Sequence, residues 1–429
     1  MIQSAKGTYD ILPSDISKWH YLEAIIREVC ELYNYQEIRT PIFESTGLFE
    51  RGVGESTDIV TKEMYTFLDK GNRSITLRPE GTAGVVRSYV EHKMYAEANQ
   101  LTKLYYIGPM FRYERMQKGR SRQFYQFGVE ALGANNPMLD AEVIALSVNI
   151  FKRLGLKEVK VLINTLGDTE SRLNYRKALI NHLKPFQDSL CTDCKKRLEI
   201  NPLRVLDCKV DKNHQAIKTA PEMKAYLNAE SQQFFDNVLK CLDDSGIEYV
   251  LDNNLVRGLD YYNHTVYEII SNVEGFGAQT ALGGGGRYNG LVQVIGGPDI
   301  PGVGFAFGMD RLILALEAEN ITIPESENVD VYLVTMSDKT NQFAMKILDI
   351  LRKNQIKCDK DYFDRKVKAQ FKQADKVKAK YVIIIGEEEM KQNKVSIKNM
   401  KNEVQETIEV KELVKELTER LEVYYESNS

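Results

Sequence analysis

The chain has 429 residues, of which 43% are hydrophobic and 28% charged, and its net charge is −4. This length predicts about three domains with a substantial core, and the charge balance excludes a cationic nucleic-acid coat. Six scattered cysteines exclude a disulfide scaffold, and neither an apolar signal segment nor a run long enough to cross a bilayer is present. We therefore expect a reduced, cytoplasmic protein with no membrane contact.

Residues 1–169 contain the sequence patterns of both helices and strands. Hydrophobic spacing predicts helices over residues 16–33, 81–97 and 139–153. An extended run at 37–43 contains Pro41, which indicates a strand edge. Aromatic and β-branched residues predict two strands, 104–113 and 123–132, joined by the charged loop 114–122. We expect these two strands to form a hairpin with an unusually basic loop.

The pattern changes twice in the second part of the chain. Residues 170–250 carry Lys- and Glu-rich helical patterns, typical of an inserted helical subdomain. Strand patterns return at 265–270, 279–282 and 302–307, with a cluster of glycines at 283–286. Beyond a polar linker at 324–328, the patterns of a small α/β domain follow in this order: strand 329–335, helix 341–353, a short strand, helix 366–379 and strand 381–385.

Several common catalytic motifs are missing. No Gly-Lys dipeptide occurs, which excludes a P-loop, and no His-Glu-x-x-His occurs, which excludes a zincin. The glycine cluster does not fit the dinucleotide fingerprint and follows no βαβ unit. With five histidines and no Gly-x-Ser-x-Gly, a Ser-His-Asp hydrolase is disfavoured.

The basic hairpin carries the first candidate site. Strand alternation places Met110 and Arg112 on one face and Phe111 and Tyr113 on the other. An arginine held on a strand within a sheet is costly unless an anion meets it, and a guanidinium binds phosphate in a bidentate manner. The alternative is an ion pair between Arg112 and a glutamate on a solvated face.

The strand at 302–308 and the helix after it carry the second candidate site. Small residues alternate with large ones, so one face of the strand is nearly bare and a flat base or ribose could approach it. Arg311 then lies in the first turn of a helix, where its charge opposes the macrodipole. That placement suggests a polyphosphate ligand. The alternative is a packing strand followed by a solvent-facing arginine.

A cysteine cluster lies in the predicted insertion. Cys191, Cys194, Cys208 and His214 follow the spacing Cys-x2-Cys-x13-Cys-x5-His, which is compatible with zinc. A second Cys-x2-Cys is missing and charged residues crowd the first. We expect no metal bound by the protein's cysteines, and zinc remains the alternative.

The motifs together resemble the class II aminoacyl-tRNA synthetases. Residues 111–114 (FRYE) resemble the second motif of that class, residues 304–311 (GFAFGMDR) the third, and the run ending at 39–42 the first, a dimer-interface pattern. Two further segments resemble the histidine signatures of the histidyl-tRNA synthetase family: 255–262 (LVRGLDYY) and 281–288 (ALGGGGRY). The segments 77–82 (LRPEGT) and 6–10 (KGTYD) agree with that family.

The resemblance implies a fold, a reaction and a domain layout. The expected fold is α+β: an antiparallel-sheet catalytic core (1–169 and 251–325) with a helical insertion (170–250) and a C-terminal α/β anticodon-binding domain (329–429). The expected reaction is activation of L-histidine with ATP and Mg²⁺, followed by transfer of histidine to tRNA(His). The expected assembly is a homodimer.

The resemblance also implies residue roles. The expected catalytic residues are Arg257 and Arg112. The histidine-binding residues are expected to be Glu80, Thr82, Gln126, Glu130, Tyr261 and Tyr262. ATP would be bound by Arg112, Glu114, Arg120 and Arg311. The tRNA would be bound by Arg115, Gln117, Lys366, Lys372 and Lys376.

The C-terminal domain contains a basic stretch. Residues 352–380 include eleven Lys or Arg against four Asp or Glu. In the helix predicted there, an apolar stripe leaves one face to four lysines: Lys366, Lys372, Lys376 and Lys380. Such a face neutralises phosphates, although an ordinary solvated helix face has the same pattern.

Two functions other than that of a synthetase are compatible with parts of the sequence. The regulatory subunit of ATP phosphoribosyltransferase resembles this catalytic core but lacks the anticodon domain and has eroded motifs. Here Arg112, Arg257, Arg311 and the C-terminal domain are all present, which favours the synthetase. In a plain RNA-binding module, the ATP-type motifs would have no purpose.

Overall fold

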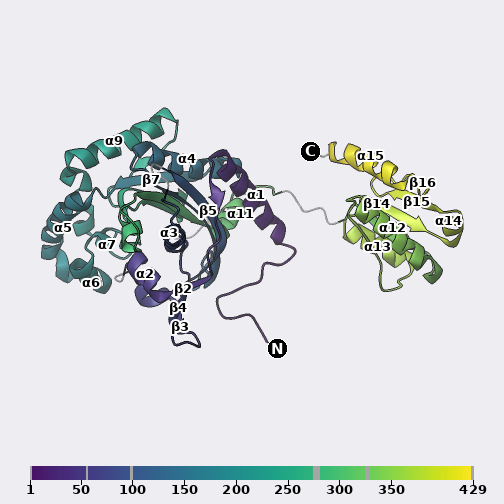
Figure 1. Cartoon of the computed structure of the whole chain (residues 1–429), viewed down its shortest axis with the longest axis horizontal. Coiled ribbons are helices and arrows are strands. Elements are labelled where there is room, and N and C mark those ends of the chain that lie inside the picture. The colour runs from purple at the N-terminus through teal and green to yellow at the C-terminus, as the bar shows by residue number, and fades with distance from the viewer. Residues whose placement is uncertain (1, 55–56, 97–99, 274–280, 324–328, 427–429) are drawn as a thin grey trace. The chain divides into compact units, whose positions relative to one another are not determined.

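The computed structural model describes residues 2–54, 57–96, 100–273, 281–323 and 329–426. The chain divides into two compact units, Met1–Pro324 and Glu325–Ser429 (Figure 1). The predicted linker at 324–328 lies outside the described residues. Among the helices that are described, none is both long and apolar enough to cross a bilayer.

The first unit is built on an eight-stranded sheet with the order β1-β5-β6-β11-β10-β9-β7-β8. Its central pairs are antiparallel, and only the edge pairs β1–β5 and β7–β8 are parallel. The predicted α+β class with a mainly antiparallel core is confirmed. The strands are β1 Gln36–Glu37, β5 Thr102–Phe111, β6 Gln123–Leu132, β7 Val159–Thr165, β8 Val250–Leu251, β9 Asn263–Ser271, β10 Ala281–Arg287 and β11 Gly302–Gly308.

One face of this sheet packs on helices and forms the main core. The core cluster joins Trp19, Phe127, Phe151 and Phe307 from helices and strands far apart in sequence. Burial of this apolar surface is the main source of stability. The helices over this face are α1 Ile16–Leu32, α4 Pro137–Arg153, α9 Ala229–Asp244 and α11 Met309–Ala318.

A small second sheet and several short helices complete the first unit. Its strand order is β2-β4-β3. The bounds are β2 Phe43–Ser45, α2 Thr46–Val53, the π-helix η1 Ile59–Glu63, β3 Tyr65–Leu68, β4 Ser74–Leu77, α3 Thr82–Glu91 and α10 Leu291–Val294.

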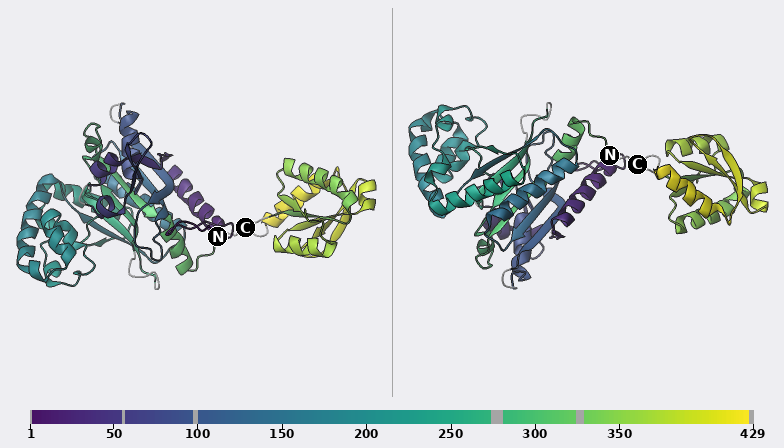
Figure 2. Two further views of the ribbon diagram at one scale, coloured as in Figure 1. Left: turned by 90° about the horizontal axis from the view of Figure 1, so that it is seen from below. Right: turned by 90° about the horizontal axis from the view of Figure 1, so that it is seen from above.

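The inserted segment is helical, as predicted, and gathers at one end of the first unit (Figure 2). Apart from α9, which packs on α4, its helices share a hydrophobic cluster with α3 and with residues of the large sheet, such as Val266. The segment is therefore packed against the core. Its elements before α9 are α5 Thr169–Leu183, η2 Lys184–Ser189, α6 Thr192–Ile200, α7 Leu203–Leu206, α8 Gln215–Lys218 and η3 Met223–Tyr226.

The second unit contains a five-stranded sheet with the order β13-β12-β14-β15-β16. The pairs β12–β13 and β12–β14 are parallel, and the last two pairs are antiparallel. Its elements are β12 Val331–Thr335, η4 Asp338–Thr340, α12 Asn341–Lys353, β13 Cys358–Lys360, α13 Val367–Lys376, β14 Tyr381–Ile385, α14 Glu387–Lys391, β15 Lys394–Asn399, β16 Gln405–Glu409 and α15 Leu413–Glu426.

Two sequence-based predictions need correction. The glycines at 283–286 do not follow a strand but form the middle of β10, where neighbouring strands approach too closely for side chains. Lys380 does not face solvent: it is 6% exposed, and its Nζ lies 3.0 Å from the carboxylate of Asp330. A buried charge needs such a partner, so Lys380 belongs to the core of the second unit.

Candidate active site

A cavity of about 260 Å³ lies on the face of the large sheet opposite the main core. Ten of the residues predicted to act in catalysis or binding line it: Glu80, Thr82, Arg112, Glu114, Arg120, Gln126, Arg257, Tyr261, Tyr262 and Arg311. They come from β6, α3, α11, the ends of β4 and β5, the hairpin loop and the loop before β9. The fold thus brings together segments that are more than 200 residues apart.

Strand β6 shows how the sheet divides core from site. Phe127, Val129 and Ala131 point into the main core, so Gln126 and Glu130 point to the opposite face. Glu130 pairs in register with Gly304 of β11. A Cβ at Gly304 would lie 2.2 Å from Oε2 of Glu130. Glycine is therefore required at this position for the glutamate to fit.

Two carboxylates share one hydroxyl-bearing residue at the closed end of the cavity. Glu80 accepts hydrogen bonds from the backbone N–H groups of Thr82 and Ala83, both at 2.8 Å. The hydroxyl of Thr82 donates to Glu130 at 2.7 Å. The hydroxyl of Tyr288 donates to the other oxygen of Glu130. Thr82 therefore links the two acids through its backbone and its side chain.

Burial gives these acids unusual proton affinities. Desolvation raises the pKa of Glu130 to about 8, although the hydrogen bonds from Tyr288 and Thr82 act in the opposite direction. Desolvation also raises the pKa of Glu80, against the hydrogen bonds from Ala83 and Thr82. Two carboxylates this close favour a cationic ligand, which would stabilise their charged forms.

Glu130 does not itself line the cavity. It is 1% exposed and lies behind Thr82, with both oxygens engaged by hydroxyl groups. The sequence predicted the correct sheet face, because alternation decides that. How deeply Glu130 is buried on this face depends on how neighbouring side chains pack, which the alternation of the strand does not specify.

The open part of the cavity is rich in arginine. Arg112, Arg120, Arg257 and Arg311 all line it. Burial lowers the pKa of Arg311, and the nearby charge of Arg120 adds to this effect. Four guanidinium groups around one small space favour a polyanionic ligand.

Arg112 is held inside the cavity and not on a solvated face. Its Nε donates to the carbonyl of Pro79 at 2.7 Å, and its guanidinium lies over the ring of Phe124. One carboxylate oxygen of Glu114 lies 3.8 Å from a guanidinium nitrogen of Arg112, and the other oxygen accepts a hydrogen bond from Arg120 at 2.6 Å. The ion pair of Arg112 with a glutamate, which the alternative interpretation placed on a solvated face, is present but lies in the cavity.

The guanidinium group of Arg257 lies against the glycine-rich strand β10, next to Gly284. This group donates to Glu268 of β9 at 2.9 Å. A Cβ at Gly284 would lie 2.8 Å from the same guanidinium nitrogen and 2.4 Å from the carbonyl of Tyr267. The bare backbone of β10 therefore leaves room for this arginine. Sequence reasoning missed Glu268, which is separated from the signature and has no motif around it.

Asp310 fixes the start of α11 beside the cavity. Its carboxylate accepts the backbone N–H of Tyr125 at 2.8 Å and the hydroxyl of Tyr9. This contact ties the N-terminal segment and the hairpin to the helix that carries Arg311. Tyr9 lies within the KGTYD segment, but its role was not predicted.

The residues predicted to bind tRNA lie outside the cavity. Arg115 and Gln117 are exposed on the hairpin loop of the first unit. Lys366, Lys372 and Lys376 are exposed on or beside α13 of the second unit. Accessibility of this kind is necessary for contact with a large polyanion.

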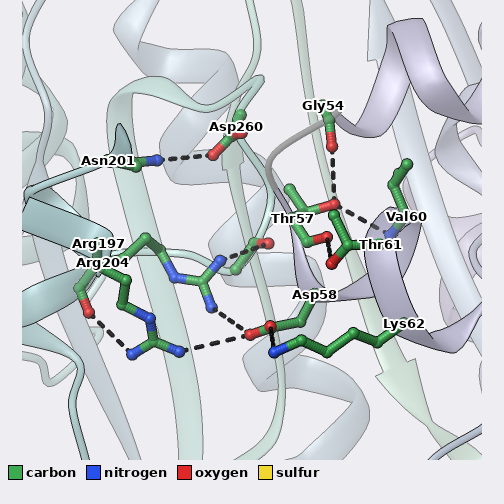
Figure 3. Close-up of polar contacts among 11 residues, drawn as sticks. Gly54, Thr57, Asp58, Val60, Thr61, Lys62, Arg197, Asn201, Arg204 and Asp260 are labelled. Atoms are coloured by element: carbon green, nitrogen blue, oxygen red, sulfur yellow. Dashed lines mark hydrogen bonds and ion pairs between the residues drawn. The ribbon is translucent and has the colours of Figure 1, made fainter. Parts of the chain in front are cut away.

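The inserted helices hold the loop that carries Arg257. Figure 3 shows two arginines of the insertion directed at Asp58, which lies beside η1; one of its oxygens is 3.4 Å from Arg197 and 3.6 Å from Arg204. Lys62 pairs with the other oxygen of Asp58 at 2.9 Å. Because the two arginines come from α6 and α7, the network joins the insertion to the catalytic core.

Three residues of the insertion directly contact the loop before β9, which carries the LVRGLDYY segment (255–262) and is called the signature loop below. Arg204 donates to the carbonyl of Gly258 at 3.2 Å. The side-chain amide of Asn201 donates to Asp260 at 2.9 Å (Figure 3). Arg172 of α5 donates to the carbonyl of Tyr262 at 2.8 Å. These contacts flank Arg257 and Tyr261, so the insertion sets the position of two cavity-lining residues.

Comparison with known proteins gives one consistent result. The sequence profile described as histidyl-tRNA synthetase matches residues 7–312, and that described as anticodon binding domain matches 330–420. A histidine–tRNA ligase of Bacillus cytotoxicus is 55% identical over 420 residues, 98% of this chain and 99% of its own. One of Staphylococcus aureus (strain JH9) is 56% identical over 415 residues, 96% and 99% of the two chains. The crystal structure of apo S. aureus histidyl-tRNA synthetase matches with a TM-score of 0.84 at 50% identity, covering 97% of this chain and 100% of that one.

The network in Figure 3 yields a test of how the signature loop is positioned. Arg204→Ala removes the contacts to Gly258 and Asp58, each worth about 1–2 kcal/mol. We expect backbone amides of residues 257–262 to exchange hydrogen roughly tenfold faster, measured by mass spectrometry. Lys62→Ala is the control, because Lys62 pairs with Asp58 but does not contact the loop. Equal exchange in both variants would contradict this role for Arg204.

Proposed function

The chain belongs to the histidyl-tRNA synthetase family and charges tRNA with histidine, and from this premise we propose that its cavity holds histidine and ATP side by side. The family match covers the catalytic signatures and the anticodon binding domain, which excludes the regulatory-subunit alternative. A plain RNA-binding module is excluded for the same reason. The roles of individual residues below are our proposal.

The division of charge within the cavity carries this assignment. One end has the carboxylate of Glu80, with Glu130 buried behind Thr82, and the rest of the cavity has four arginines, two of which pair with Glu114 and Glu268. Histidine offers an α-ammonium group and ring N–H donors, whereas ATP offers a triphosphate. Each substrate thus matches one end, and the histidine carboxylate points toward the α-phosphate.

The proposed activation step needs no general base. A carboxylate oxygen of histidine forms a bond to the α-phosphorus of ATP, while the bond from that phosphorus to the pyrophosphate oxygen breaks. Arg257 and Arg112 would stabilise the negative charge on the α-phosphate in the transition state. Arg311 would hold the γ-phosphate, and Glu114 the adenine amino group. The 3′-hydroxyl of tRNA then attacks the histidyl carbonyl carbon, and AMP leaves.

The cavity also fits a magnesium ion bound with the nucleotide. Mg²⁺ prefers oxygen ligands, and Glu268 and Glu114 provide carboxylates that line the cavity beside the arginines. When bound with ATP, the ion supplies positive charge that neutralises the phosphates. The arginines would do the same at the positions that the ion leaves free.

Recognition of the amino acid would use the closed end of the cavity. Glu80, Thr82 and Gln126 would meet the ammonium end, and Tyr261 and Tyr262 would flank the imidazole. Glu130 would act at the imidazole end from behind Thr82, by orienting its hydroxyl and supplying negative charge. A site built from hydrogen-bonding groups rejects an apolar amino acid, since these groups would be left unpaired.

Binding of tRNA would use both units of the chain. Arg115 and Gln117 on the hairpin would meet the acceptor end, and the lysines of α13 would meet the anticodon arm. The exposed rings of Tyr362 and Phe363 precede α13 and offer surfaces on which bases stack. Ile42 and Phe43, 45% and 55% exposed, continue the predicted dimer motif and support a homodimer, which we place in the cytoplasm.

The catalytic assignment of Arg257 can be tested with ATP–pyrophosphate exchange. Arg257→Ala should slow histidine-dependent exchange by roughly 10²-fold or more, because the lost contact acts mainly on the transition state. Histidine affinity, measured by calorimetry, should change little. Arg153→Ala, at an exposed arginine on α4, is the matched control. A rate within a few-fold of wild type would show that Arg257 is not catalytic.

The raised pKa of Glu130 predicts proton release when histidine binds. The ammonium group and the ring N–H of histidine favour the charged carboxylate, so binding lowers the pKa from about 8 and histidine affinity should rise between pH 6.5 and 8. Calorimetry in buffers of different ionisation enthalpy measures this release. Glu130→Gln should abolish it and weaken histidine by about 1.5–3 kcal/mol, with ATP affinity nearly unchanged. Unchanged proton release in the variant would assign the proton to another group.

The basic helix predicts a salt-dependent contribution to tRNA binding. Reversing the charge of Lys366, Lys372 and Lys376 to glutamate should lower tRNA affinity at least tenfold and reduce its salt dependence. Histidine activation should stay unchanged, because all three lie in the second unit. The control reverses three exposed lysines elsewhere in this unit, Lys391, Lys411 and Lys415. Equal affinity in both triple variants would locate the tRNA contacts elsewhere.

A further inference from the structure

Three cysteines and one aspartate converge in the inserted helical segment, and none of the four lines the cavity described above. Cys191, Cys194, Cys208 and Asp211 each offer one ligand atom, and these atoms all lie within 4.8 Å of one another. Three of the four residues are buried and Cys191 is half-buried. Nothing in the proposed aminoacylation mechanism uses them.

The distance between two of the sulfur atoms matches a tetrahedral metal site. Zinc binds cysteine sulfur at about 2.3 Å, which separates two sulfurs of a tetrahedron by roughly 3.7–3.8 Å. The Sγ atoms of Cys191 and Cys208 are 3.7 Å apart. A disulfide requires about 2.05 Å, and no cysteine of the described chain forms one.

Two equivalent turns supply the four ligands. The backbone N–H of Cys194 donates to Sγ of Cys191 at 3.5 Å, and the N–H of Asp211 donates to Sγ of Cys208 at 3.5 Å. The first turn is Cys-x2-Cys and the second is Cys-x2-Asp. N–H donation favours the thiolate form, which is the form that binds metal.

Asp211 is the fourth residue of the cluster, a place that the Cys-x2-Cys-x13-Cys-x5-His spacing would give to His214. That histidine is not among the four converging residues, and its Nδ1 accepts the N–H of Ala216 at the start of α8. Asp211 is 7% exposed, and its carboxylate sits among three sulfur atoms. One of its oxygens accepts the backbone N–H of Cys191 at 3.0 Å, which orients the carboxylate toward the sulfur atoms where a metal ion would lie.

The charged residues around the cluster are compatible with a metal. Three thiolates and a carboxylate carry more negative charge than a divalent ion neutralises. Lysines that directly follow two of the ligands in sequence can balance the excess: Lys195 and Lys196 after Cys194, and Lys212 after Asp211. Lys195 and Lys196 are among the charged residues that disfavoured a metal when spacing alone was considered.

The cluster lies at the base of the hairpin formed by α6 and α7. Cys191 caps the start of α6, and Cys208 follows the end of α7. Between them lie Arg197, Asn201 and Arg204, which bind Asp58, Asp260 and Gly258 (Figure 3). A metal that joins the two ends of this hairpin would fix the residues that hold the signature loop.

We propose that Cys191, Cys194, Cys208 and Asp211 bind one zinc ion, and that this ion holds the α6–α7 hairpin against the loop carrying Arg257. Zinc accepts mixed sulfur and oxygen ligands in tetrahedral geometry, whereas Mg²⁺ and Ca²⁺ prefer oxygen alone. With four protein ligands the site is closed. Its role is therefore structural, and the three thiols lose their protons on binding.

Metal analysis of the purified full-length protein tests the proposal first. After dialysis, plasma mass spectrometry should find about one zinc ion per chain in the wild type. Cys191→Ser should retain less than about a tenth of this zinc; the half-buried position makes serine tolerable to the fold. Cys241→Ser, a half-buried cysteine outside the cluster, should retain all of it. A wild type that neither contains zinc nor takes it up after reduction overturns the proposal.

A variant that strengthens the site keeps the test independent of folding defects. Asp211→Cys completes a second Cys-x2-Cys turn and should slow zinc loss to a chelator at least tenfold. Cobalt added to apo wild-type protein should give the sulfur-to-metal charge-transfer absorption of a tetrahedral thiolate site. Zinc loss at the wild-type rate in Asp211→Cys, or octahedral cobalt spectra, would overturn the ligand set.

A further measurement tests whether the bound zinc also positions the signature loop. Chelation of the wild type should speed hydrogen exchange in residues 192–206 and 257–262 and lower the melting temperature. Chelation of the Cys191→Ser variant should change neither. Unchanged exchange in the wild type after complete zinc removal would overturn the link to the signature loop.

Discussion

The binding site depends on the burial of two carboxylates that share Thr82. Glu80 at one end of the cavity and Glu130 behind it are 3% and 1% exposed, and each engages Thr82 through hydrogen bonds. Desolvation holds their pKa values above the ordinary range, so their charged forms need a partner of opposite sign. The glycines of β10 and β11 give these side chains and Arg257 their space. In the proposed site, selection of histidine would thus follow from packing as much as from hydrogen bonding.

The inserted helices add a second layer of control over the same site. Arg257 lies in a loop whose backbone carbonyls are bound by Arg204 and Arg172. Neither arginine lines the cavity, so their influence passes through the loop. A structural zinc ion at the base of the α6–α7 hairpin would make this arrangement rigid without any contribution to the chemistry. The insertion would then couple metal binding to the geometry of histidine activation.

Much of the architecture was predictable because it follows local rules. The hairpin at 104–132, the helix at 16–33 and the helix at 341–353 were predicted nearly to their ends, since hydrophobic periodicity determines such elements. The glycine run of β10 was missed as a strand because glycine has no strand preference of its own, and only close approach of β9 and β11 explains it. The strands β15 and β16 and the helix α15 were not predicted.

The sequence by itself determined the family resemblance, the antiparallel core and the polarity of the site residues, because motifs and alternation are properties of neighbouring positions. Tertiary structure decided what depends on distant segments. It placed Glu130 behind Thr82, buried Lys380 against Asp330, and brought Glu268 to Arg257. It also set Asp211 beside three cysteines, a grouping hidden in sequence because its second turn ends in aspartate. Burial and charge pairing decide such contacts, and they act through space without regard to chain order.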